Sequence, residues 1–124
     1  MLHHISFPVS DLARATALYD AALGALGFAR VCTTDKFSGY GAAGGEDVFG
    51  LFATENAQAA GAGFHLAFAA PSRDAVDRFH AAAIKHGARD NGAPGLREKY
   101  GPDYYAAFVI DLDGHRLEAV FKGA

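Results

Sequence analysis

The sequence contains an internal repeat with a spacing of 61 residues, about half of the 124-residue chain. The segment His4-Ile-Ser-Phe7 is followed by Ser10-Asp11 and a stretch of apolar residues at helical spacing. It matches His65-Leu-Ala-Phe68, which is followed by Ser72-Arg-Asp74 and a second such stretch. Self-similarity at a fixed period indicates that one supersecondary unit occurs more than once. The repeat therefore predicts two copies of the same small unit.

Each copy is predicted to be a strand, a helix and three further strands. A Ser/Asp start precedes each helix, and Gly27 and Gly87 follow them, where a left-handed glycine closes a last turn. Asp113-Gly114 is a strong two-residue hairpin signal. In the first copy, the further strands are expected at 29–34, 37–42 and 47–54. In the second copy, one strand is expected to start at 89 and the other two to cover 104–111 and 115–121. A long loop is expected over 90–105.

The chain is expected to be a single α+β domain of two modules. Module 1 covers residues 1–54, a linker rich in small residues covers 55–63, and module 2 covers 64–124. A unit of about 60 residues buries too little apolar surface to be stable alone. The two modules are therefore expected to pack on each other or on a second chain.

Composition and charge exclude several classes of protein. The chain is 51% hydrophobic and 20% charged, and its formal net charge is −3 without any block of like charges. A nucleic-acid partner is therefore not expected. No apolar run approaches the roughly 20 residues of a membrane helix, so no membrane partner is expected either. The single cysteine, Cys32, has no partner for an internal disulfide. The first residues lack the pattern of a signal peptide, which favours a cytoplasmic protein.

Three residues form a candidate metal site. Side chains alternate across a strand, so His4 and His65 lie on the face opposite their bulky apolar neighbours. Glu118 lies mid-strand among apolar residues, where an unpaired carboxylate is costly. Each residue taken alone is more often an ordinary hydrogen-bonded or ion-paired side chain. Together, two histidines and a carboxylate match the facial triad that suits Fe(II) or Mn(II), and less distinctively Zn(II). His115, next to the hairpin turn, is expected at the surface.

The chain resembles the vicinal oxygen chelate superfamily, which includes glyoxalase I, extradiol dioxygenases, fosfomycin-resistance transferases and bleomycin-resistance proteins. The resemblance rests on the strand-opening His4, on Ser10-Asp11-Leu with Tyr19-Asp20, on His65, and on Phe108-Val-Ile-Asp-Leu-Asp113-Gly-His-Arg-Leu-Glu118. It implies paired β-α-β-β-β modules that form a cupped, barrel-like mixed sheet with the helices outside. It also implies a divalent metal, one of Fe, Mn, Zn or Ni, held by residues at the positions of His4, His65 and Glu118.

Similar glyoxalase I enzymes add a fourth ligand from the last strand of the first module. That position falls at Gly50, which has no side chain to offer. This departure argues against glyoxalase I activity. A different strand register would bring Glu46 or Glu55 to that position instead.

The segment 90–105 supplies candidate substrate contacts. Arg97 and Lys99 offer positive charge, and Tyr100, Tyr104 and Tyr105 offer phenols that suit an anionic or aromatic substrate. Tyr104 and Tyr105 are also the candidate catalytic residues. The same tyrosines are equally compatible with packing on a partner subunit. Phe49 and Phe52, in the last strand of module 1, are further candidate substrate contacts.

The expected function is that of a small metalloenzyme, dioxygenase-like or a lyase or transferase of this superfamily. The metal would act as a Lewis acid on adjacent oxygens of a small substrate. The alternative is a metal-free protein of the bleomycin-resistance type, which binds a small molecule such as an antibiotic. A homodimer is expected in either case, because the sheet edges and apolar faces of two small modules need cover.

Overall fold

The computed structural model of the chain describes residues 1–123 and contains the predicted repeat. Residue 124, the last of module 2, lies outside the described residues. Module 1 contains β1 (Ile5–Val9), α1 (Leu12–Ala25), β2 (Ala29–Thr33), β3 (Phe37–Gly41) and β4 (Phe49–Ala53). Module 2 contains β5 (Leu66–Ala69), α2 (Arg73–Lys85), β6 (Arg89–Leu96), the 3-10 turn η1 (Glu98–Tyr100), β7 (Tyr104–Ile110) and β8 (Arg116–Lys122).

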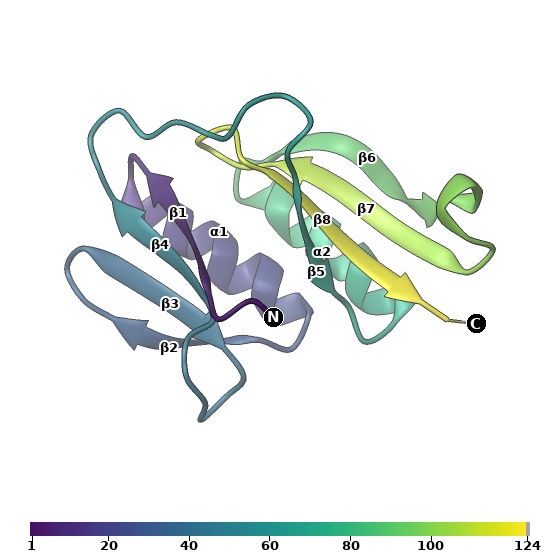
Figure 1. The fold of residues 1–124 in the computed structure, drawn as a ribbon, viewed down its shortest axis with the longest axis horizontal. Helices are drawn as coiled ribbons and strands as arrows, with labels where there is room; N and C mark the ends of the chain where they lie inside the picture. Colours follow the sequence, from purple (N-terminus) through teal and green to yellow (C-terminus); the bar gives the residue numbers. More distant parts are fainter. Residues whose placement is uncertain (124) are drawn as a thin grey trace.

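The strands form two four-stranded mixed sheets with the same topology. The orders are β1-β4-β3-β2 and β5-β8-β7-β6, and in each sheet the first and last strands of the module pair in parallel. Figure 1 shows the sheets side by side with both helices behind them. The α+β class and the paired modules are confirmed, as two curved sheets rather than one closed barrel. We call the sheet surface turned away from the helices the open face.

The helix boundaries follow the signals in the sequence. The Asp11 carboxylate accepts a hydrogen bond from the backbone N–H of Arg14, and the Ser72 hydroxyl accepts one from the N–H of Ala75. Both contacts satisfy a helix N–H group that has no partner within the helix. Gly27 and Gly87 follow the helices with φ angles of 92° and 102°. Neither helix within residues 1–123 is long and apolar enough to cross a membrane.

The core lies between the helices and the covered face of the sheets. Leu18 and Leu23 of α1 and Val76 and Phe79 of α2 are almost fully buried. They pack with strand residues of odd parity, among them Val9, Leu51, Val109 and Leu117. The two helices also contact each other, so one core serves both modules. The parity rule therefore separates this core from the open face.

The segment after α2 differs from the expected long loop. Residues 89–96 form β6, which pairs with β7, and η1 shortens the remaining connection. The β6–β7 register shifts twice, on either side of Gly92. Bulges of this kind allow a strand to contain glycine and proline. The composition Asn-Gly-Ala-Pro-Gly therefore led to the wrong expectation of a loop.

The β7–β8 turn binds the two modules together. Tyr19 of α1 donates a hydrogen bond of 2.5 Å to Asp111, whose other oxygen accepts the N–H groups of Asp113 and His115. The His115 ring lies 2.7 Å from the carbonyl oxygen of Pro8 and stacks on Phe7. His115 is only 4% exposed, so the expectation of a surface residue was wrong. Burial raises the pKa of Asp111 above its ordinary value.

Candidate metal and substrate site

Strand register places Glu118 and Gly50 at equivalent positions on the open face. Glu118 of β8 lies opposite Ala67 of β5, and Gly50 of β4 lies opposite Ser6 of β1. Ala67 follows His65 by two residues, as Ser6 follows His4. The predicted ligand position of module 2 thus carries a carboxylate, whereas its counterpart in module 1 carries none. Glu46 and Glu55 are both exposed and lie outside β4.

Module 2 brings His65, Glu118 and Tyr104 together. The His65 Nε2 atom lies 3.0 Å from Glu118 Oε1, and the Tyr104 hydroxyl donates to Glu118 Oε2. The Glu118 side chain is 2% exposed and that of His65 is 52% exposed. Burial and the bond to Glu118 raise the pKa of Tyr104 to about 12. The phenol therefore keeps its proton and acts as a donor at neutral pH.

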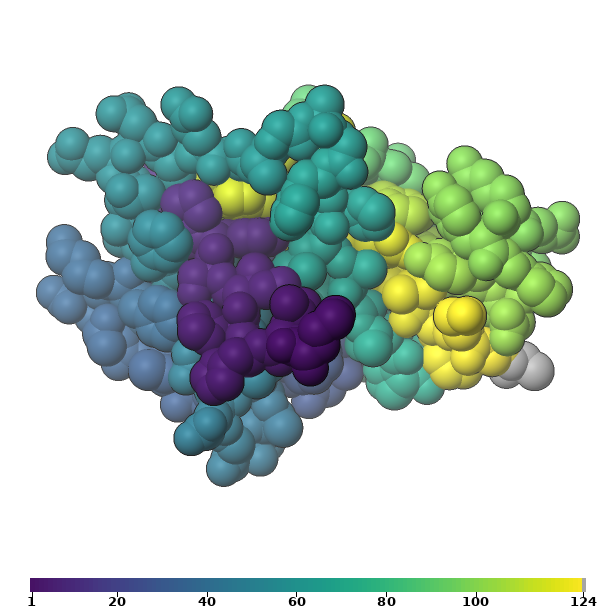
Figure 2. Space-filling view, viewed as in Figure 1, coloured from purple at the N-terminus to yellow at the C-terminus, as the bar shows by residue number. Residues whose placement is uncertain are grey.

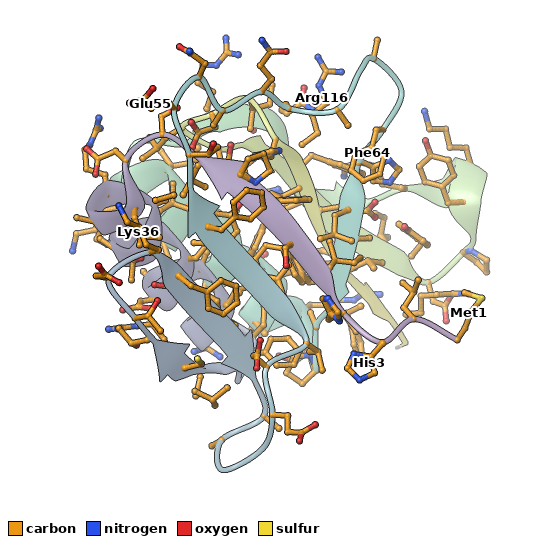
Figure 3. All side chains as sticks on the ribbon, turned by 60° about the vertical axis from the view of Figure 1, so that its left-hand side comes forward. Met1, His3, Lys36, Glu55, Phe64 and Arg116 are labelled. Atoms are coloured by element: carbon orange, nitrogen blue, oxygen red, sulfur yellow. The ribbon has the colours of Figure 1, made fainter. Side chains whose placement is uncertain are left out.

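His4 lies apart from this cluster. β1 rises from the N-terminus, whereas β5 descends from the opposite end of the molecule, so the two strand starts are at opposite ends (Figure 1). Figure 3 labels His3 at the start of β1 and Phe64 just before β5, in agreement with this placement. The His4 Nδ1 atom lies 2.8 Å from His3 Nδ1. Within residues 1–123, no three His, Cys, Asp or Glu side chains gather as a metal site.

The open face of module 1 is apolar. The ring of Phe37 covers Gly50 so closely that a Cβ atom built on this glycine would lie 2.4 Å from the ring. Phe52 lies directly opposite Phe37 on the neighbouring strand and is 39% exposed. The alternation of β3 places Phe37 on this face, but only the structure reveals that it fills the position of a missing side chain.

A second group of predicted residues lines a hollow of about 240 Å³ next to the His65–Glu118 pair. Arg97, Lys99 and Tyr100 line it together with Asn91, Gly92 and Phe108. The Arg97 guanidinium donates to the carbonyl oxygens of Gly95 and Ala93, at 3.0 and 2.7 Å, and lies over the Phe108 ring. The ring of Phe108 also lies 6.3 Å from that of His65. The hollow and the pair are therefore neighbours on the open face.

Two predicted residues face the other way. The Tyr105 hydroxyl donates to Asp77 of α2 at 2.6 Å, on the covered face of the sheet. Phe49 is 5% exposed and packs against Tyr19 and Phe7 in the core. Both have odd parity in their strands. The structure thus separates them from Tyr104 and Phe52, which share the open face.

Residues 1–119 match the family described as the Glyoxalase/Bleomycin resistance protein/Dioxygenase superfamily. A glyoxalase/bleomycin resistance protein from Albidiferax ferrireducens is 32% identical, with 99% of both chains covered and a TM-score of 0.85. The fosfomycin resistance protein FosX from Mesorhizobium loti is 22% identical over 100% of this chain and 92% of its own, with a TM-score of 0.69.

A variant of FosX from Listeria monocytogenes, in complex with Mn(II) and 1S,2S-dihydroxypropylphosphonic acid, shares the fold as well. It is 17% identical over 99% of this chain and 90% of its own, with a TM-score of 0.70. No match was found among curated proteins. The likeness to the two FosX proteins is a likeness of fold alone.

Proposed function

The chain belongs to the Glyoxalase/Bleomycin resistance protein/Dioxygenase superfamily, and we propose that it is a divalent-metal-dependent enzyme of that superfamily acting on a small anionic substrate. The observation that carries this proposal is the pair formed by His65 and the buried Glu118 on the open face. A buried carboxylate needs a cation or several hydrogen bonds. In this chain its partners are one imidazole and one phenol.

The pair fits a divalent transition metal. Two adjacent ligand atoms that each lie about 2.1 Å from one ion are themselves about 3 Å apart in octahedral geometry. His65 Nε2 and Glu118 Oε1 are 3.0 Å apart. The exposed imidazole leaves an approach from solvent. An ion held here supplies Lewis-acid stabilisation of charge on substrate oxygens.

The surrounding residues have separate roles in the proposal. Tyr104 holds Glu118 in place by its hydrogen bond to Oε2. The same bond fixes the direction in which the other carboxylate oxygen points. Arg97 and Lys99 bind the anionic end of the substrate in the neighbouring hollow. Phe108 forms the floor between the two regions, since its ring contacts both Arg97 and His65.

His4 completes the ligand set from a second copy of the chain in this proposal. The support is that His4 and His65 start strands at opposite ends of one chain, so a single chain gathers only two of the three ligands. The exposed apolar side chains Phe52, on the open face of module 1, and Tyr100, at the hollow of module 2, suit a face covered by a partner. The homodimer then builds two equal sites.

Metal titration tests the proposal directly. Calorimetry with Mn(II) and Fe(II) is expected to give one ion per chain for the natural sequence. His65→Ala and Glu118→Gln should each abolish tight binding, and His86→Ala, a histidine outside the site, should leave it unchanged. If the protein binds no metal but retains a small-molecule ligand, it is instead a metal-free binding protein of the bleomycin-resistance type.

Mixing two inactive variants tests the shared site. In a His4→Ala chain paired with a His65→Ala chain, one site of the heterodimer receives all three ligands and the other receives only Glu118. Refolded mixtures should therefore regain one metal per heterodimer, and the two unmixed variants should regain none. If both variants stay metal-free after mixing, a site built from two chains is excluded.

Glyoxalase I activity is expected to be weak or absent. The carboxylate that such enzymes place in the last strand of module 1 has no counterpart at Gly50, whose side-chain space Phe37 occupies. Without it, a base near the substrate carbon is missing. The metal-loaded protein should be assayed with the hemithioacetal of methylglyoxal and glutathione. A turnover on the order of 10² per second would contradict this part of the proposal.

A further inference from the structure

The boundary between the modules contains an apolar cavity of about 280 Å³, on the covered side of the sheets. Its walls come from both modules. Leu23, Phe28, Tyr40 and Phe49 of module 1 face Leu66 and Phe68 of β5. His3 and His4 lie at its mouth, next to the exposed Leu2. In Figure 2 these N-terminal residues, in the darkest purple, lie on the surface between the two modules.

The two ends of the boundary between the modules are built differently. At one end Tyr19, Asp111 and His115 form a closed hydrogen-bonded network. At the other end, beside the N-terminus, the side chains do not fill the space between the modules, and the cavity remains. Protein interiors seldom contain spaces much larger than a water molecule, and apolar cavities remain dry and accept apolar molecules. A cavity of this size is therefore suited to an occupant.

We propose that this cavity is a binding site for a small neutral aromatic molecule, distinct from the site at His65 and Glu118. Four of its lining side chains are aromatic, and Phe49 and Phe68 already meet edge to face with ring centroids 5.3 Å apart. A further ring inserted among them gains both apolar burial and favourable ring geometry.

The lining also defines which ligands are excluded. None of its residues, all within the described chain, is Lys, Arg, Asp or Glu. The Tyr40 hydroxyl is already engaged, because it donates to Asp20 at 2.9 Å. An anionic group would therefore be buried without a charged partner, which is costly. This separates the cavity from the hollow beside Arg97 and Lys99.

The two imidazoles give the site a polar rim. Their Nδ1 atoms are 2.8 Å apart and hydrogen-bond to each other, so the two rings hold one another at the mouth. The Nε2 atom of His3 remains for one hydrogen bond with a ligand. A flat aromatic molecule with a single N–H or O–H group at its edge matches this arrangement of apolar walls and polar rim.

Indole is a suitable probe, because it is flat, neutral and carries one N–H group. The chain contains no tryptophan, so the fluorescence of bound indole is read against tyrosine alone. We expect saturable binding of one indole per chain with a blue-shifted emission. Methyl resonances of Ile5 and Leu23 should shift on titration, and those of Leu96, on the other sheet, should not. Absence of saturable binding, or shifts confined to Leu96, would overturn the site.

Filling the cavity provides the decisive variant. Leu66→Phe places a larger side chain in the wall and should weaken indole binding at least about tenfold, whereas Leu96→Phe, a matched change outside the cavity, should alter it less than about twofold. If Leu66→Phe does not fold, Val48→Phe tests the same point, because Val48 lies at the lining and is 53% exposed. Unchanged binding in the filled variant would overturn the proposal.

The rim is tested with 1-methylindole, which has the same ring but no N–H group. It is expected to bind about threefold to tenfold more weakly than indole, as for a hydrogen bond that is lost on a ligand. Equal affinities for indole and 1-methylindole would show that no hydrogen bond forms at the rim, and would contradict this part of the proposal.

Discussion

The two modules share a backbone plan but carry opposite chemistry on their open faces. In module 2 this face holds Glu118, Tyr104 and His65, with Arg97 nearby. In module 1 the equivalent position of Glu118 is Gly50, and the ring of Phe37 fills the space above it. The open face of module 2 is therefore polar and charged, and that of module 1 is apolar.

The difference shows that a repeat in sequence does not imply a repeat in function. The positions that face the helices are apolar in both modules, because both must pack on the same core. The positions of the open face are free of that requirement, so they differ. Chemistry in this chain is accordingly concentrated where packing constrains the sequence least.

The largest expected effect comes from removing the carboxylate of module 2. Glu118→Ala should lower Mn(II) affinity by more than about 100-fold, because even residues that only support a ligand contribute about 10- to 100-fold. Glu55→Ala and Glu46→Ala, the acidic residues that a different strand register would have brought to the open position of module 1, should have no effect. Loss of affinity in either control would show that module 1 supplies a ligand and would break the comparison.

The second largest effect is expected at the hydrogen-bonded network of Tyr19, Asp111 and His115, which we call the joint between the modules. Tyr19→Phe removes the hydrogen bond to the buried Asp111 and is expected to cost about 2 kcal/mol of unfolding free energy. Thermal or denaturant unfolding measures the change. The matched variant Tyr105→Phe removes a bond to Asp77 on an exposed part of α2 and should cost less. An equal loss of unfolding free energy in the two variants would mean that the buried hydrogen bond at the joint stabilises the fold no more than an exposed one does.

The same joint predicts a pH dependence. Burial raises the pKa of Asp111 above its ordinary value of 3.8, so the folded state favours the protonated carboxyl. This contribution to stability is present below pH 3.8 and is lost as the pH rises through the folded pKa. Compared with Asp111→Asn, which stays neutral, the natural protein should become relatively less stable as the pH rises above 3.8 and through the raised pKa of Asp111. A constant difference in melting temperature would contradict the shift.

A smaller effect is expected at Tyr104. Tyr104→Phe keeps the ring and removes the hydrogen bond to Glu118, which should weaken metal binding about tenfold and leave the fold intact. Tyr100→Phe changes a phenol in the neighbouring hollow and is the control. If Tyr104→Phe binds metal more tightly, the phenol competes with the ion for Glu118 and does not support it.

The smallest effect concerns module 1. In Gly50→Ala the added Cβ would lie 2.4 Å from the Phe37 ring, which must move, at a cost of about 1 kcal/mol in melting experiments. Phe37→Leu in the same chain should restore much of the stability. If Gly50→Ala is neutral by itself, the ring does not define the surface of module 1.

The sequence predicted the elements and faces well because these depend on local patterns. Parity placed His65 and Glu118 on one face, and the register of β4 put Gly50 at the counterpart position as expected. The environment of His115 could not be predicted, because its neighbours Pro8 and Phe7 lie more than 100 residues away along the chain. The separation of His4 from Glu118 was equally inaccessible, since parity assigns a face but not the direction in which two sheets meet.

The joint at Asp111 also bears on how the molecule opens. Its carboxylate binds a side chain of α1 and two backbone N–H groups of the β7–β8 turn, so neither module can unfold locally without breaking contacts of the other. The amide protons of Asp113 and His115 should therefore exchange with solvent only through global unfolding. Hydrogen exchange would then show a single cooperative unit, in which exchange at the β7–β8 turn of module 2 occurs only when module 1 unfolds as well.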